Sequence, residues 1–136
     1  MKKLTILEDL KQQKDLLSVF SPEKYVFNEE EIQRTFCKRM TKTQQRKYFN
    51  AYKSADNLIQ NQGFLSEEDF ATELKKLAVL YPIMASKDIP REFLEVINHV
   101  LRKLFEKNAK DTVYAQKSFS AFVRFYETII AYSRDK

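Results

Sequence analysis

The scarcity of glycine limits most strongly what this chain can fold into. Its 136 residues include one glycine, Gly63, and three prolines. Hairpins and β-sandwiches need many turn positions with positive φ, and glycine adopts that conformation at the least cost. Helices need few such positions. Since 43% of the residues are hydrophobic, with eleven Phe and seven Tyr, the chain has enough large side chains to fill a helical interior. We therefore expect an all-α fold.

The spacing of apolar residues is helical along nearly the whole chain. It predicts helices over 4–20, about 28–39, from Thr41 or Thr43 to Gly63, over 66–84, over 93–105 after a start at 88–90, and over 119–130, with a weaker segment at 22–27. Pro82 is expected to kink its helix near Ala78 or to end it early. The pattern thus predicts a single domain, 1–136, a compact bundle of about five to six helices. It leaves open whether residues 1–37 join the bundle or form a less tightly packed arm.

The side chains needed for catalysis or metal binding are sparse. The only histidine is His99 and the only cysteine is Cys37, so neither a nucleophile–base pair nor a zinc cluster is indicated. We interpret both as structural residues. The acidic triplets 29–31 and 67–69 fall at predicted helix starts, where capping and the helix dipole explain them. One glycine cannot build a phosphate-binding loop. We predict no enzyme activity, no cofactor and no metal site.

No apolar run approaches the roughly 20 residues that cross a bilayer. The N-terminus has acidic residues where a signal peptide would have an apolar core. A lone cysteine also excludes an internal disulfide. We expect a cytoplasmic protein with no membrane partner.

The net charge of +5 comes from one stretch. From Ile32 to Ala55 the chain has seven basic residues and no acidic one, whereas the rest is slightly acidic. Most basic runs are solvated helix faces, but such faces usually mix both signs to avoid self-repulsion. This stretch therefore favours an anionic partner such as a nucleic-acid backbone. Tyr48, Phe49 and Tyr52 interleave with it and could stack on bases, although their spacing fits core packing better.

Three stretches resemble a known family over roughly residues 38–133. They are Thr41-Lys-Thr-Gln-Gln-Arg-Lys-Tyr-Phe49, the leucine-rich run from Leu74 to Lys87, and Phe119-Ser-Ala-Phe-Val-Arg-Phe-Tyr-Glu-Thr-Ile-Ile-Ala-Tyr132. In order and spacing they are similar to the small subunit of the type III-A CRISPR effector, the Csm complex. Departures are Gln45 in place of Leu, Ser86-Lys87 in place of Gly-Arg, and Thr128 in place of Ala. The first 37 residues show no likeness.

The resemblance implies a non-catalytic helical subunit that stacks in several copies along the duplex of guide RNA and target RNA. Its partners would be these RNAs and other CRISPR effector subunits. By position, it implies RNA contacts for Thr43, Arg46 and Lys87, the last with a weaker contact because lysine lacks the planar fork of arginine. The charge pattern independently adds five candidates: Lys38, Arg39, Lys42, Lys47 and Lys53.

Other interpretations of the basic stretch stay open. The chain could be a helical adaptor that docks on an acidic protein, or the small subunit of another type III effector. A helix-turn-helix DNA reader is disfavoured because no base-reading helix follows a tight turn after Ile59. Finally, the helix from Phe119 to Tyr132 has more aromatic residues than one bundle face easily buries, so self-association is expected.

Overall fold

The computed structural model describes residues 4–37, 42–87 and 89–133, and these parts contain only helices and their connections. In chain order they are α1 (Ile6–Lys11), α2 (Leu16–Val19), the 3-10 turn η1 (Pro22–Lys24), α3 (Glu29–Phe36), α4 (Lys42–Gln62), α5 (Glu67–Ala85), α6 (Arg91–Asn108) and α7 (Thr112–Tyr132). The prediction of an all-α bundle is confirmed.

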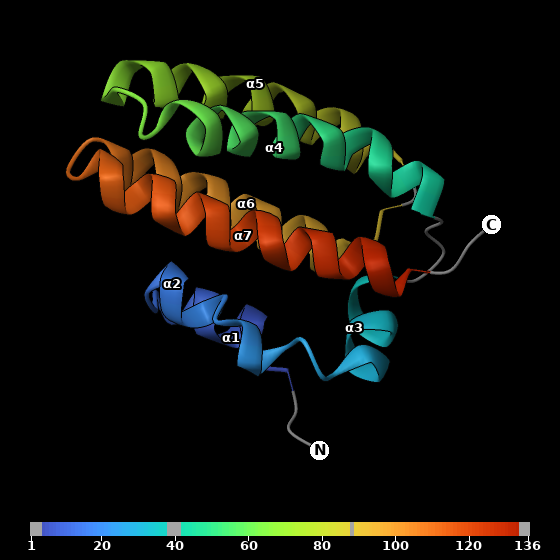
Figure 1. Cartoon of the computed structure of the whole chain (residues 1–136). Coiled ribbons are helices and arrows are strands. Elements are labelled where there is room, and N and C mark those ends of the chain that lie inside the picture. Colours follow the sequence, from blue (N-terminus) through green and yellow to red (C-terminus); the bar gives the residue numbers. More distant parts are fainter. Residues whose placement is uncertain (1–3, 38–41, 88, 134–136) are drawn as a thin grey trace.

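The helices form three layers (Figure 1). The long helices α4 and α5 run antiparallel in one outer layer, and α6 and α7 form the middle layer. The short helices α1, α2 and α3 cover the other side of α6 and α7; residues 4–37 are called the N-terminal layer below. Helix α7 is buried over most of its circumference, whereas α6 buries one apolar face and keeps a charged side toward solvent.

Helix α7 is the centre of the core. Phe125 contacts rings of the N-terminal layer, with centroid distances of 5.0 Å to Tyr25, 5.1 Å to Phe20 and 5.6 Å to Phe36. One residue further on, Tyr126 faces the opposite way, toward rings of α4 and α6. The aromatic residues of α7 that suggested self-association are therefore buried within the chain itself, so that argument no longer supports it.

The prediction of one continuous helix over 4–20 is wrong, because two short helices, α1 and α2, occupy this segment. The chain breaks after α1 at Gln13, whose φ of 61° lies in the left-handed region, and resumes at α2. The apolar stripe explains the break, because Leu10 should be followed by an apolar residue three or four positions later. Those positions hold Gln13 and Lys14, so a continuous helix would bury polar side chains.

The predicted start of the last helix at 119 is seven residues too late, since α7 begins at Thr112, but several other predicted boundaries hold. Gly63 ends α4 with a φ of 84°, and its N–H donates to the carbonyl of Ile59. Ser66 caps α5 by accepting from the N–H of Asp69 at 3.1 Å. Pro82 does not end α5 early, since the helix continues to Ala85. It lies exposed near the end of the helix, so it removes one hydrogen bond, to the carbonyl of Ala78, with only three helical residues after it. Helix α3 ends at Phe36, earlier than predicted, and Arg39 lies outside the described residues.

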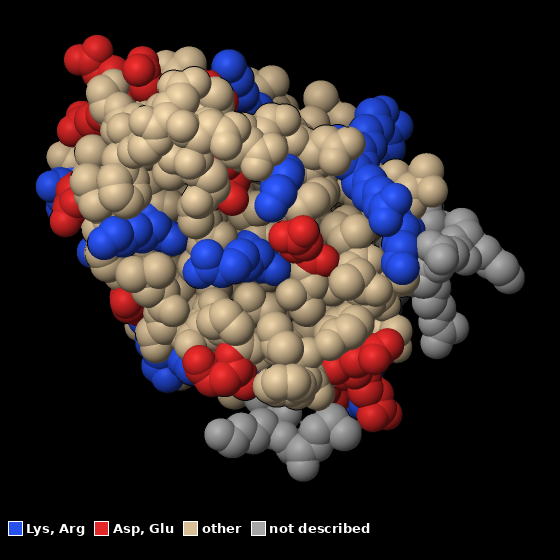
Figure 2. Space-filling model, viewed as in Figure 1, with Lys and Arg blue, Asp and Glu red and all other residues tan. Residues whose placement is uncertain are grey.

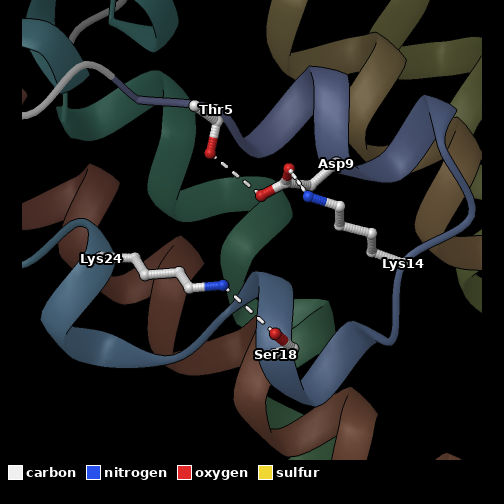
Figure 3. Close-up of polar contacts among 5 residues, drawn as sticks. All are labelled: Thr5, Asp9, Lys14, Ser18 and Lys24. Carbon is white, nitrogen blue, oxygen red and sulfur yellow. Dashed lines mark hydrogen bonds and ion pairs between the residues drawn. The ribbon is translucent and has the colours of Figure 1, made fainter.

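Charged side chains of the N-terminal layer form hydrogen bonds to other residues of the layer (Figure 3). Asp9 is 6% exposed and accepts from the Thr5 hydroxyl and the Lys14 ammonium, both at 3.0 Å. Burial raises the pKa of the Asp9 carboxyl, but the hydrogen bonds from Lys14 and Thr5 outweigh it, so the pKa lies below its ordinary value. Lys24 donates to the Ser18 hydroxyl at 3.2 Å. Lys14 thus links the connection after α1 back to that helix, and Lys24 links η1 to α2.

Candidate nucleic-acid interface

The first two turns of α4 carry their charge against the helix dipole. Positive side chains lie at Lys42, Arg46 and Lys47, no acidic residue stands in the first turn, and no basic residue stands in the last. A cation near a helix N-terminus is disfavoured by about 0.3–1 kcal/mol. Helices α3 and α5 show the opposite and favourable arrangement, with acidic triplets in their first turns. Lys42, in the first turn of α4, therefore does not stabilise the helix through its dipole, and Arg46 and Lys47 lie beyond the turn where the dipole acts most.

The sequence-predicted residues divide between two sides of α4. Lys42, Arg46 and Lys53 are four and seven residues apart, which places them along one side of the helix. Lys47 lies about 100° further round, and its ammonium lies 5.9 Å from the centroid of the Tyr48 ring. Thr43 is exposed between the two sides.

Three other predicted residues lie off α4. Lys87 is exposed just after α5, at the end of the bundle where α4 begins (Figure 1). Lys38 and Arg39 lie outside the described residues.

The side of α4 that bears Lys42, Arg46 and Lys53 adjoins α7. Lys53 pairs with Glu127 of α7 at 3.7 Å, and the Ser120 hydroxyl donates to the Asp56 carboxylate at 2.5 Å. Ser120 and Glu127 are seven residues apart, so one side of α7 faces this edge of α4.

Two exposed cations of α7 lie on that same side. Lys117 and Arg124 are spaced by three or four residues from Ser120 and Glu127. Sequence analysis missed both, because residues 56–136 are neutral as a whole. The available signal was two cations seven residues apart on a helix whose only acid is Glu127.

These residues make one surface, which we call the basic face: Lys42, Arg46, Lys53, Lys117 and Arg124. Figure 2 shows Lys and Arg side chains across α7 and at the N-terminal end of α4, with acidic groups mainly where α5 begins and where α3 lies. Within the described parts of the chain, Arg46, Lys117 and Arg124 make no ion pair. The only acidic residue of α4, Asp56, is 6% exposed. The face is therefore open to an anionic partner.

The aromatic residues that interleave with the basic stretch do not belong to this surface. Tyr48, Phe49 and Tyr52 are buried, and Tyr52 contacts rings of α7. The interpretation of these residues as core is confirmed, and that of a base-stacking platform is wrong. Arg34, another cation of the stretch, lies on α3 and pairs with Glu30 at 3.8 Å and Glu31 at 2.8 Å.

The described residues bring together no obvious reactive or metal-binding group. They contain no cluster of three His, Cys, Asp or Glu side chains that could hold a metal ion. Cys37 is buried, which raises the pKa of its thiol. Burial likewise raises the pKa of the Tyr52 and Tyr126 hydroxyls. Among the residues that the structure describes, no helix has the length and apolar character to cross a membrane.

Fold and surface together define a class: an all-helical protein with a basic face built from two neighbouring helices. The family model described as Csm2 Type III-A matches residues 21–135. The chain therefore belongs to the Csm2 family of type III-A CRISPR systems, as the three motifs suggested. The match begins at residue 21, so the expectation that the first 37 residues lie outside the likeness is wrong for η1 and α3. Comparisons with curated proteins and with solved structures give no significant match.

Proposed function

We propose that the chain is a non-catalytic, RNA-binding small subunit of a type III-A Csm complex, and that the basic face contacts the backbone of guide RNA and target RNA. One observation supports this most: cations from two helices share a surface on which three have no ion pair. Like charges without partners repel one another and lower the stability of the free protein, and bound phosphates would relieve this repulsion. Family membership supplies the context of a CRISPR effector, acting in the cytoplasm.

The proposed contacts bind phosphates rather than bases. Lysine and arginine side chains on a helical surface neutralise backbone charge and release counterions, giving a salt slope of about −0.7 per contact on single strands. Five cations would give a slope of about −3.5, with little dependence on base sequence. Thr43, Lys47 and Lys87 are proposed as weaker contacts at the edge of this surface, and Lys38 and Arg39 keep their proposed role from the charge pattern.

The test is a pair of charge reversals in the full chain. In Arg46→Glu/Arg124→Glu the salt slope for RNA should flatten by about 1.4, with the same loss of affinity for unrelated sequences. The matched control is Arg102→Glu/Lys103→Glu on α6, which changes the net charge equally on another part of the surface. Filter binding over a salt series measures both. Negligible RNA binding by the wild-type chain at low salt would contradict the proposal and favour an adaptor for an acidic protein.

Stacking of several copies would use other surfaces. Val79 and Ile83 are 70% and 48% exposed on α5, with the exposed Lys75 one turn before Val79. In the N-terminal layer, at the other side of the bundle (Figure 1), Phe27 is 89% exposed beside the acidic triplet 29–31. Both patches are partly apolar, and Glu29 beside Phe27 has the charge opposite to that of Lys75, whereas Glu30 and Glu31 are paired with Arg34. We propose that the patch of one copy docks on the opposite patch of the next, a head-to-tail contact that forms open filaments.

Mixing two variants tests the stacking. Phe27→Ser removes one patch, and Val79→Ser/Ile83→Ser removes the other, so each variant alone should fail to form assemblies on a long RNA. A mixture of the two should form dimers and nothing longer, because one intact pair of patches remains. Sedimentation velocity measures this, with Phe105→Ser as the control at another exposed aromatic. Unchanged assembly by Phe27→Ser would contradict the contact.

A further inference from the structure

A hollow of about 400 Å³ opens beside the basic face, where α2, α4 and α7 meet. Its apolar walls are Leu17 of α2, Ile59 of α4 and Phe64 of the α4–α5 loop. Its polar lining includes Gln60, Lys117 and Arg124, and no acidic side chain lines it. Lys117 and Arg124 are the α7 cations of the basic face. The hollow therefore adjoins the basic face and shares two of its cations.

The loop that carries Phe64 is held by the buried side chain of Gln116. Gln116 is 0% exposed and bonds both polar groups of the Leu65 backbone: its amide oxygen accepts from the N–H at 2.7 Å, and its amide nitrogen donates to the carbonyl at 2.8 Å. Phe64 precedes Leu65 and Lys117 follows Gln116. These two bonds hold the loop backbone next to Phe64 against α7 next to Lys117, and the Phe64 side chain is half exposed.

The polar lining is also oriented. The Gln60 amide nitrogen donates to the Ser120 hydroxyl oxygen at 3.4 Å, and that hydroxyl donates to the Asp56 carboxylate. With its nitrogen engaged, Gln60 has its amide oxygen left as a hydrogen-bond acceptor. Asp56 does not line the hollow, so its charge is not presented to a ligand there.

We infer that this hollow receives one unpaired nucleotide of the bound RNA, with its base against Phe64 and its phosphates on Lys117 and Arg124. The inference rests on the proposed RNA-binding function. A flat ring with a nearby phosphate is the ligand that matches an exposed aromatic wall, apolar neighbours and two cations. The Gln60 oxygen would accept from a base amino group. A phosphate alone would leave the apolar walls exposed to water, and a fully paired duplex has no free base to occupy the hollow.

This site depends in part on this chain's own N-terminal layer. Leu17, which closes one wall, precedes the residues that the family model matches. A backbone-binding surface reads no base, whereas a nucleotide pocket reports whether a base is unpaired. The subunit would thereby prefer RNA that carries a bulge or a flipped base over an uninterrupted duplex.

The experiment compares two RNA duplexes that differ only in one extrahelical 2-aminopurine nucleotide. The full chain should bind the bulged duplex about tenfold more tightly, with a fall in fluorescence as the probe stacks. Phe64→Ala should abolish both the preference and the fluorescence change while leaving affinity for the paired duplex unchanged. Phe64→Tyr should retain them, because it keeps an aromatic face. Phe105→Ala is the control for removing an exposed ring from another site, and thermal unfolding checks that each variant folds.

The outcomes separate this inference from the proposed function. If the paired duplex binds and the bulge adds nothing, or if Phe64→Ala keeps the preference, the nucleotide site is wrong and the basic face stands. If neither duplex binds, the proposed function and this site both fail. If the preference is absent and Phe64→Ala instead loses binding to a neighbouring Csm subunit, the hollow is a protein-docking site and the inference is overturned.

Discussion

The N-terminal layer and the basic face use charge in opposite ways. In the layer each described cation has a partner: Lys14 has Asp9, Lys24 has Ser18, Arg34 has Glu30 and Glu31, and Lys11 lies 3.9 Å from Glu95. On the basic face Lys53 pairs with Glu127, whereas Arg46, Lys117 and Arg124 make no ion pair with the described residues. The layer is held mainly by its buried apolar side chains, and its charge pairs add a smaller contribution. Unpaired like charges cost stability through self-repulsion, which an anionic partner would relieve.

The largest effect is expected where the layer meets the core. Phe125→Ala removes a fully buried ring that touches three rings of the layer, and should lower the free energy of unfolding by about 3–5 kcal/mol. Urea denaturation followed by circular dichroism measures it. Phe105→Ala, at an exposed ring of α6, should cost far less. A loss below about 1 kcal/mol in Phe125→Ala would show that the layer is not fastened there.

The next effect concerns two neighbouring residues of α4. Arg46→Glu and Lys47→Glu change the charge equally at adjacent positions, but Arg46 lies on the α7 side and Lys47 does not. RNA affinity should fall about tenfold in the first and about threefold in the second at low salt. Fluorescence anisotropy at several salt concentrations measures the difference. Equal losses would mean that general charge, rather than the basic face, governs binding.

A smaller effect is expected in the layer when its central carboxylate is neutralised. Asp9→Asn loses the charged acceptor for Lys14 and Thr5, which should cost about 1 kcal/mol because Lys14 is half exposed. Since the pKa of Asp9 is lowered on folding, its stabilisation is present above pH 3.8, the ordinary value, and is lost as pH falls below it. Unfolding followed from pH 5 to pH 2.5 should therefore bring wild type and variant together. Parallel curves would argue against the role of this group.

The smallest effect concerns the ion pair of the basic face, Lys53–Glu127. Glu127→Gln removes the acid that pairs with Lys53, a pair that is exposed and contributes at most about 1 kcal/mol to folding. Stability should change by less than about 0.5 kcal/mol, while RNA affinity should rise about threefold because repulsion from phosphates is removed. Isothermal titration measures the affinity. A decrease would indicate that Glu127 positions Lys53 for its contact.

Local patterns predicted much of this molecule because they act through neighbours along the chain. Gly63 and Ser66 marked helix ends, since positive φ and a side-chain cap are decided within one turn. The sequence also shows polar residues at Gln13 and Lys14, where the apolar stripe needs an apolar one. The predicted continuous helix over 4–20 does not take this into account. The basic stretch pointed to α4, and the α4 residues of the basic face were among those predicted from it.

The sequence by itself determined the helical class, the family motifs and the excess of positive charge around α4. These follow from composition and from spacing within single helices. Only the tertiary structure decided that Lys117 and Arg124 lie beside α4, and that Phe125 packs against the N-terminal layer while Tyr126 packs against α4 and α6. The physical reason is that each depends on which helix faces which. That is determined by the packing of all three layers around α7 and cannot be read from the periodicity of one segment.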